Sequence, residues 1–87
     1  MEVMGHKFEA LREIMRDYGR LAVPSEKLGL EDDLFSAGLD SAAVVNVMLA
    51  IEDHFGIEIP ERLLTRRAFS SLAALDRLVC DATGVAT

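Results

Sequence analysis

The chain has little of what marks secreted, membrane-spanning or disulfide-bonded proteins. Its 87 residues contain one cysteine, Cys80, which excludes an intramolecular disulfide and fits a reducing cytoplasm. Cys80 lies on an apolar stripe near the C-terminus, so we expect a buried structural thiol. Charge interrupts the segment 1–7, and no apolar run is long enough for a signal peptide or a transmembrane span.

Basic residues are too few for a nucleic-acid-binding surface. The formal net charge of −6 argues against a nucleic acid or an anionic membrane as a partner. The stretch 28–61 has no lysine or arginine, and it holds eight acids: Glu31, Asp32, Asp33, Asp40, Glu52, Asp53, Glu58 and Glu61. Such a stretch is either an ordinary solvated face or a docking surface for basic partners.

Patterns that would bind a metal or a free phosphate are missing as well. The acids at 31–33 lack the alternating positions, the glycine and the closing glutamate of a calcium-binding EF-hand loop. His6 and His54 have no metal-ligand spacing with the cysteine, and the glycines do not form a phosphate-binding loop. We therefore expect no metal site.

Apolar residues at helical spacing are abundant. They make up 51% of the chain, which predicts one folded domain over 1–87. Their spacing predicts a first helix over about 4–18, with Gly19 as its left-handed C-cap. The connection 20–40 is long, and long connections in small domains are commonly functional. Five large apolar residues are expected to pin it to the core: Leu28, Leu30, Leu34, Phe35 and Leu39.

A second helix is predicted to begin at Asp40 or Ser41, because short oxygen-bearing side chains satisfy the free amides at a helix start. Gly56 is expected to end this helix. The segment 57–60 should be extended, since its proline restricts the residue before it.

The remaining residues predict two more helices. A short helix is expected at about 61–66, and Ser70 or Ser71 is expected to cap the last one. The predicted fold is therefore an all-α, monomeric bundle of three main helices, with a short third helix and a long first loop.

The second helix carries apolar residues on two faces, since each residue advances about 100° around the axis. One face reads as an ordinary core stripe of Val44, Val47, Met48, Ile51 and Phe55. More than a quarter turn away lies a second stripe of Ala42, Val45 and Leu49, flanked by Glu52 and Asp53. Either the short third helix covers this second stripe, or it stays exposed as an acid-rimmed docking surface.

A motif lies where the long connection meets the second helix. Residues 33–41 read Asp-Leu-Phe-Ser-Ala-Gly-Leu-Asp-Ser, and this pattern resembles the attachment motif of acyl and peptidyl carrier proteins. The similarity continues through 44–60 and again at 69–72, where the family enters its last helix. It covers nearly the whole chain and implies the family's right-handed four-helix carrier bundle.

The resemblance also implies a prosthetic group and partners. In the family, a phosphopantetheinyl transferase uses coenzyme A and Mg²⁺ to place 4′-phosphopantetheine on the serine that Ser41 matches, and it reads the counterpart of Asp40. The thiol of this arm carries cargo as a thioester to acyl-transfer enzymes downstream. Partner enzymes commonly face the positions that match Val45, Leu49, Glu52 and Asp53, and Ala42 belongs to the same stripe.

The residues around Ser41 indicate a substrate rather than a catalyst, so we expect no enzymatic activity. A nucleophilic serine needs an adjacent base. His54 lies thirteen residues along the same helix, or roughly 20 Å at the helical rise. At a helix N-terminus the free amides and the helix dipole favour a phosphodiester, although Asp40 opposes it locally.

Several positions separate the chain from fatty-acid carriers. Ala42 stands where many of them have a larger aliphatic residue, and Asn46 where they often have an acid. Arg62, Arg66 and Arg67 make the third-helix region basic. The chain looks more like discrete aminoacyl carrier proteins, which are loaded by amino acid:carrier protein ligases that resemble a truncated seryl-tRNA synthetase.

Other functions remain open alternatives. The chain could be a carrier of a fatty-acid, polyketide, nonribosomal-peptide or D-alanylation pathway. It could also be a carrier-like fold that has become an armless protein-interaction module. The intact Asp40-Ser41 pair disfavours the armless module, which would need no serine there.

Overall fold

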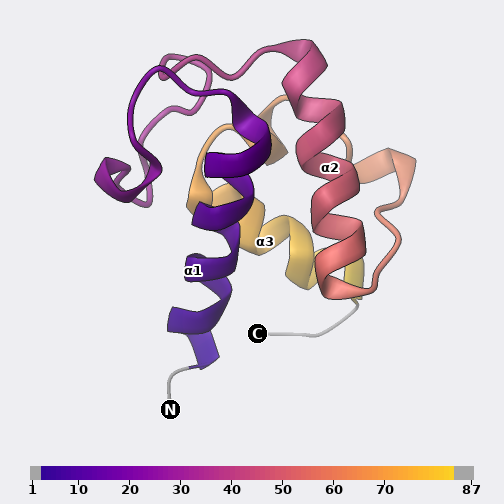
Figure 1. The fold of residues 1–87 in the computed structure, drawn as a ribbon. Coiled ribbons are helices and arrows are strands. Elements are labelled where there is room, and N and C mark those ends of the chain that lie inside the picture. Colours follow the sequence, from indigo (N-terminus) through magenta and orange to yellow (C-terminus); the bar gives the residue numbers. More distant parts are fainter. Residues whose placement is uncertain (1–2, 84–87) are drawn as a thin grey trace.

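The computed structural model describes residues 3–83, with side chains from residue 8 onward. Three α-helices dominate it: α1 (Val3–Ile14), α2 (Ser41–Phe55) and α3 (Leu72–Thr83). Helices α1 and α2 run in opposite directions and α3 crosses behind them (Figure 1). The described residues contain no strand, and none of their helices is long and apolar enough to cross a membrane. The predicted all-α bundle is confirmed.

One face of each helix forms the core. The fully buried side chains come from all three helices, the first loop and the turn after α1: Leu11, Met15, Leu34, Val47, Ile51, Leu72 and Leu75. On α2, Val47 and Ile51 are buried, and the other predicted core residues pack against them half-buried. Burying each such side chain contributes about 1.5–3 kcal/mol, so the core stripe of α2 fixes which side of this helix faces outward.

The end of the first helix differs from the prediction. A π-helical turn, η1 (Met15–Gly19), follows α1, and Arg20 rather than Gly19 adopts the left-handed conformation, with φ 55°. The wider turn takes one more residue than an α-turn, so the reversal falls one position later. Gly19 instead leaves room for a core side chain, because a Cβ there would lie 2.6 Å from the Cε of Met15 and would force that buried side chain to shift.

The long loop between α1 and α2 is held by its apolar side chains and by its backbone. Leu28, Leu34 and Leu39 are buried as predicted, and Phe35 packs partly against the core. The prediction that Leu30 lies in the core is wrong, since this side chain is 41% exposed. Its carbonyl oxygen accepts a hydrogen bond of 2.9 Å from the amide of Ala73 at the start of α3, so its backbone holds this part of the loop.

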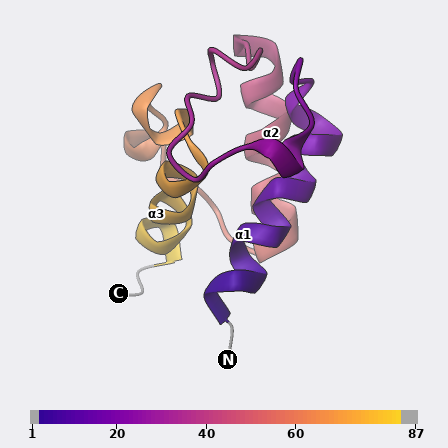
Figure 2. The same cartoon turned by 90° about the vertical axis from the view of Figure 1, so that its left-hand side faces the viewer.

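Further hydrogen bonds tie the loop to the helices on both sides. The Arg12 side chain of α1 donates to the carbonyl oxygens of Ser25 (3.0 Å) and Leu28 (2.6 Å), around the short turn η2 (Ser25–Lys27). The amide of Leu34 donates to the Ser70 carbonyl oxygen at 2.8 Å. Figure 2 shows the loop passing across α1 and α3. It is therefore an ordered part of the fold.

The predicted short helix at 61–66 is shorter than expected. Two single 3₁₀ turns stand there instead: η3 (Glu61–Leu63) and η4 (Arg67–Phe69). Leu64 leaves the helical region with φ −85° and ψ 80°. The Thr65 hydroxyl then accepts a hydrogen bond of 3.1 Å from the amide of Ala68 and so starts the second turn. A threonine hydroxyl that bonds nearby amides competes with helix continuation in this way.

Predictions for the later helix ends are confirmed. Gly56 ends α2 in the left-handed conformation with φ 65°, and the segment from 57 to 60 has no regular secondary structure, with Pro60 extended as expected. Ser71 caps α3, where its hydroxyl accepts a hydrogen bond of 3.0 Å from the amide of Ala74. The predicted buried thiol is also confirmed, since Cys80 is 8% exposed.

Candidate functional site

Ser41 is the first residue of α2 and is exposed. Asp40 before it has extended backbone angles, and its carboxylate accepts a hydrogen bond of 2.8 Å from the amide of Ala43. Of the two residues that the sequence offered for the helix start, Asp40 is thus the N-cap, and it satisfies one of the free amides there. The cap sets the direction in which the helix leaves the loop, and with it the position of the Ser41 side chain.

A tight turn at Gly38 precedes Asp40 and Ser41. Gly38 has φ 123°, a conformation that side-chain-bearing residues rarely adopt, and a Cβ there would lie 3.0 Å from the backbone nitrogen of Ala22. That nitrogen donates a 2.8 Å hydrogen bond to the carbonyl oxygen of Ala37, which closes the turn against the start of the loop. Leu39 is buried. Ser41 therefore follows a fixed turn and a buried anchor.

Asp33 organises the other end of the same motif. Its carboxylate accepts hydrogen bonds from the Phe35 amide (3.0 Å) and the Ser36 hydroxyl (2.9 Å). These bonds, first that of the Ser36 hydroxyl, lower the pKa of Asp33 below its ordinary value, and the charge of Arg66 adds a smaller contribution. Asp33 stays ionised at neutral pH and holds Phe35 in place.

Ser41 opens onto a hollow of about 390 Å³ between α2 and the segment before η4. Its walls are largely apolar and include Phe35, Val44, Met48, Leu64 and Phe69. Arg66 lies at the same hollow, and its guanidinium carbon is 3.9 Å from the centre of the Phe35 ring. The sequence indicated neither Phe35 nor Leu64 as a site residue, because nothing local to them shows that they meet Ser41.

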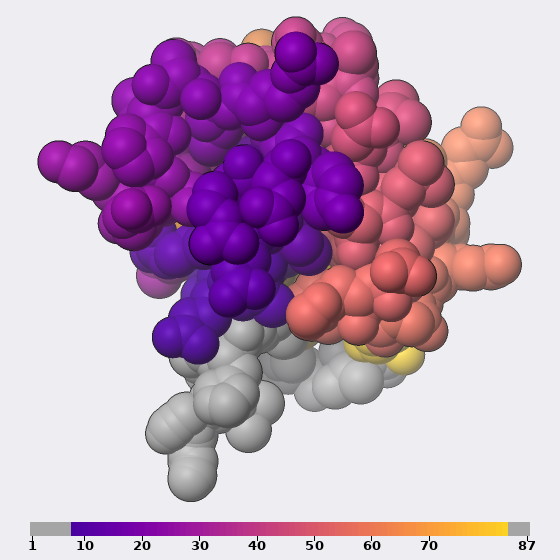
Figure 3. Space-filling view, in the orientation of Figure 1, coloured from indigo at the N-terminus to yellow at the C-terminus, as the bar shows by residue number. Residues whose placement is uncertain are grey.

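The predicted docking stripe stays on the surface. Val45 is 51% exposed, Leu49 is 52% exposed, and Ala42 is exposed beside them. The segment after Pro60 leaves the stripe uncovered, since it forms single turns rather than a covering helix. Figure 3 shows α2 lying along the surface on one side of the molecule.

The two acids predicted beside this stripe differ from each other. Asp53 is exposed. Glu52 is half-buried, and its carboxylate accepts a 2.9 Å hydrogen bond from the amide of Ile59. Glu52 therefore fastens the segment 57–60 to α2, which is a structural role that the sequence did not indicate.

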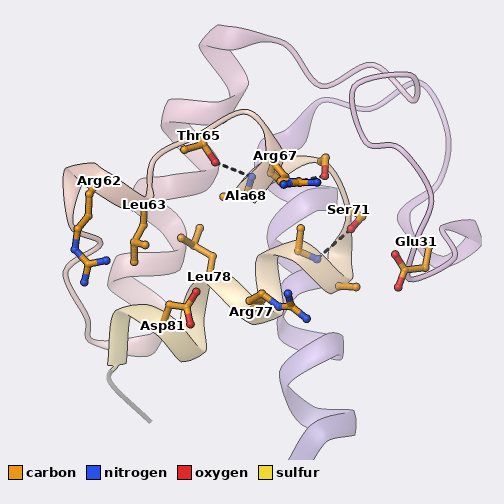
Figure 4. A pocket seen from close by; sticks show the side chains of 13 residues that line it. Glu31, Arg62, Leu63, Thr65, Arg67, Ala68, Ser71, Arg77, Leu78 and Asp81 are labelled. Atoms are coloured by element: carbon orange, nitrogen blue, oxygen red, sulfur yellow. Dashed lines mark hydrogen bonds between the residues drawn. The ribbon is translucent and has the colours of Figure 1, made fainter. Parts of the chain in front are cut away.

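A second hollow of about 430 Å³ lies on the side of α3 (Figure 4). Arg62, Arg67 and Arg77 surround it together with Glu31 and Asp81. Ser41 is not among its lining residues. Arg66 lines the Ser41 hollow and Arg67 lines this one, and both arginines also line a third hollow beside Asp33 and Phe35. Among the described residues, no three acids, histidines or cysteines are grouped so that they could hold a metal ion.

Comparisons with known proteins agree with one another. A family model described as "phosphopantetheine attachment site" matches residues 9–79. A protein named aminoacyl carrier protein, from Agrobacterium fabrum, is 44% identical over 69 residues, which cover 79% of this chain and 83% of that protein.

Two solved structures are similar over most of the chain. One is a carrier protein from Agrobacterium tumefaciens in complex with an engineered Bradyrhizobium japonicum glycine:carrier protein ligase and ATP; it has a TM-score of 0.82 and 42% identity over 85% of this chain and 96% of that one. The other is a glycylated carrier protein in complex with the Bradyrhizobium japonicum ligase. It has a TM-score of 0.73 and 25% identity over 84% of this chain and 97% of that one.

Proposed function

The chain belongs to the phosphopantetheine attachment-site family and is a carrier protein for a 4′-phosphopantetheine arm, and from this premise we propose that the arm is attached to Ser41 and carries an amino acid. The observation that supports Ser41 most directly is its position. It is exposed on the first turn of α2, beside an open and largely apolar hollow. A long flexible group attached there has room at its base and access to solvent beyond.

The site fits the group chemically as well. The Ser41 oxygen would form a bond to the phosphorus of coenzyme A that bears the pantetheine, while the pyrophosphate bond breaks and adenosine 3′,5′-bisphosphate leaves. The hydroxyl proton passes to a base of the transferase, because no histidine lies beside Ser41 among the described residues and the adjacent Asp40 carboxylate is engaged as the cap of α2. When bound, the arm supplies a terminal thiol that holds cargo as a thioester.

The residues of the chain then have distinct tasks. Ser41 provides the oxygen, and Asp40 holds the start of α2 while presenting a carboxylate to the phosphopantetheinyl transferase. Ala42, Val45, Leu49 and Asp53 form the docking surface on the same helix. We propose that Ser41 is a substrate of other enzymes, that the chain catalyses nothing itself, and that it works in the cytoplasm as one domain.

An amino acid is the cargo that the similarities favour. The Agrobacterium fabrum relative is named for an aminoacyl cargo. The similar solved carriers are bound to a glycine:carrier protein ligase, and one of them is glycylated. We propose that a ligase of this class loads the arm, and that acyl-transfer enzymes downstream remove the cargo.

Intact mass spectrometry tests both steps. Apo protein incubated with coenzyme A, Mg²⁺ and a broad-specificity phosphopantetheinyl transferase should gain the mass of one arm. Adding ATP, glycine and a glycine:carrier protein ligase should then add one aminoacyl unit, which hydroxylamine should remove because it is a thioester.

Serine variants provide the matched comparison. Ser41→Ala should fold normally and gain no mass. Ser36→Ala, at another exposed serine of the same motif, should still accept the arm. An arm on Ser41→Ala would disprove the assignment to Ser41. An unmodified but folded wild type, with a known carrier modified in parallel, would favour the armless interaction module.

A further inference from the structure

We propose that Arg66, held over the ring of Phe35, is the cation that contacts the phosphodiester formed on Ser41, and that it thereby positions the base of the arm in the hollow. This inference rests on the proposed attachment of the arm to Ser41. It assigns a role to an arginine that lies far along the sequence from both the serine and the aromatic ring that supports it.

The contact with Phe35 leaves the donors of Arg66 available. The guanidinium carbon stands over the ring, 3.9 Å from its centre, which is the position of a cation–π contact. A guanidinium carries its N–H groups in its plane, at the edges. The ion pair found among the described side chains joins Arg16 to Asp17, and the side chain of Arg66 takes part in neither an ion pair nor a hydrogen bond there, although its backbone carbonyl accepts one from the Phe69 amide. Its edge can therefore receive an oxyanion.

The platform under Arg66 is fixed by the attachment motif itself. Phe35 packs against the core, and its amide donates to Asp33. Asp33 attracts Arg66, but its two oxygens already accept bonds from the Phe35 amide and the Ser36 hydroxyl. Asp33 thus helps to keep the cation near the site without occupying its donors.

Ser41 and Arg66 line the same hollow, from opposite elements. The oxygen of Ser41 becomes part of the phosphodiester, so the new negative charge arises at the edge of this hollow. Asp40 beside it carries a charge of the same sign, which opposes the phosphodiester. A cation across the hollow offsets this repulsion, and an arginine edge can bind two phosphate oxygens at once.

Arg67 provides the matched control. It directly follows Arg66 in the sequence and carries the same charge. It lines the separate hollow in Figure 4, however, and is not among the residues that line the hollow of Ser41. Replacing either arginine removes one positive charge from the same segment, but only the replacement of Arg66 removes a cation from the hollow of Ser41.

Nuclear magnetic resonance tests the contact directly. In ¹⁵N-labelled protein, attachment of the arm should shift the Arg66 side-chain Nε–H resonance and leave that of Arg67 in place. In the holo form, Arg66→Gln should move the ³¹P resonance of the phosphodiester, while Arg67→Gln should leave it at the wild-type position. High salt should reduce the Arg66 shift, because ions screen an exposed contact.

A second variant tests the platform. Phe35→Leu keeps an apolar side chain but removes the aromatic face, so it should diminish the Arg66 shift while Arg66 itself is retained. An Arg66 resonance that does not respond to the arm, together with equal ³¹P shifts in the two arginine variants, would overturn the inference and leave the carrier function intact. A wild type that accepts no arm would overturn both.

Discussion

At the scale of single residues, Asp40 combines two tasks that substitutions can separate. Its carboxylate caps α2 by accepting from the Ala43 amide, and it places a negative charge next to Ser41. Asparagine caps a helix about as well as aspartate, whereas alanine does not. Asp40→Asn therefore removes the charge and keeps the cap, whereas Asp40→Ala removes both.

We predict that Asp40→Asn keeps nearly the wild-type stability but is modified more slowly by the transferase, because we propose that the transferase recognises the carboxylate. Asp40→Ala should lose about 1 kcal/mol of unfolding free energy as well. Urea unfolding and the rate of arm attachment measure the two effects. If Asp40→Asn were modified at the wild-type rate, Asp40 would act only as the helix cap and its charge would have no role in recognition.

Local signals predicted the residues that act through their immediate neighbours. Gly56 was identified from the sequence, and Asp40 and Ser71 were each one of two neighbouring candidates, because a cap depends on the few residues around it. The contact between Arg66 and Phe35 and the bond from Ile59 to Glu52 could not be predicted. Both depend on how separate segments fold back on each other, which single-residue patterns do not encode.

At the scale of elements, α2 serves two surfaces. Its inner face fills the core, and its outer face presents Val45 and Leu49 at about half exposure. The sequence predicted both stripes but left open whether a third helix covers the outer one. Leu64 and Thr65 decide this, because they break the expected helix into two turns. Over so few residues, the free-energy difference between one helix and two turns is too small to predict from the spacing of apolar residues.

We predict that Leu49→Gln weakens binding to the loading ligase about tenfold, the equivalent of about 1.4 kcal/mol, because an exposed apolar contact is lost. Its stability should change by no more than about 0.5 kcal/mol, as is usual for surface positions. Titration calorimetry and urea unfolding measure the two quantities.

Leu30→Gln is the matched control for this change. Leu30 is a leucine of comparable exposure in the loop, away from the stripe, and its replacement should leave the affinity unaltered. Asp53→Lys should also weaken binding, most strongly at low salt. Glu52→Lys is less informative, since it removes the bond to Ile59. Equal affinities for Leu49→Gln and Leu30→Gln would place the docking surface elsewhere.

At the scale of the whole molecule, the fold keeps the thiol of its one cysteine apart from the site of the arm. Cys80 is buried on α3, whereas Ser41 is exposed at the start of α2. A buried thiol reacts slowly, because reagents reach it only when the structure opens.

We therefore predict that folded apo protein shows no rapidly reacting thiol and that the holo form shows one per chain, on the arm. Denaturant should expose Cys80 in both forms. Labelling with a thiol reagent, followed by intact mass spectrometry, gives the number of reactive thiols per chain. Rapid labelling of Cys80 in the folded apo protein would contradict the buried position.

The proposed docking role of the outer stripe of α2 has a consequence for how enzymes share the carrier. Leu49 lies about 12 Å along the helix from Ser41, at the helical rise, so any enzyme that uses the stripe to reach the arm covers the same few side chains. Two such enzymes cannot be bound together. The order of arm attachment, loading and delivery then depends on how fast each enzyme dissociates. Because the exposed patch is small, we expect each complex to be short-lived.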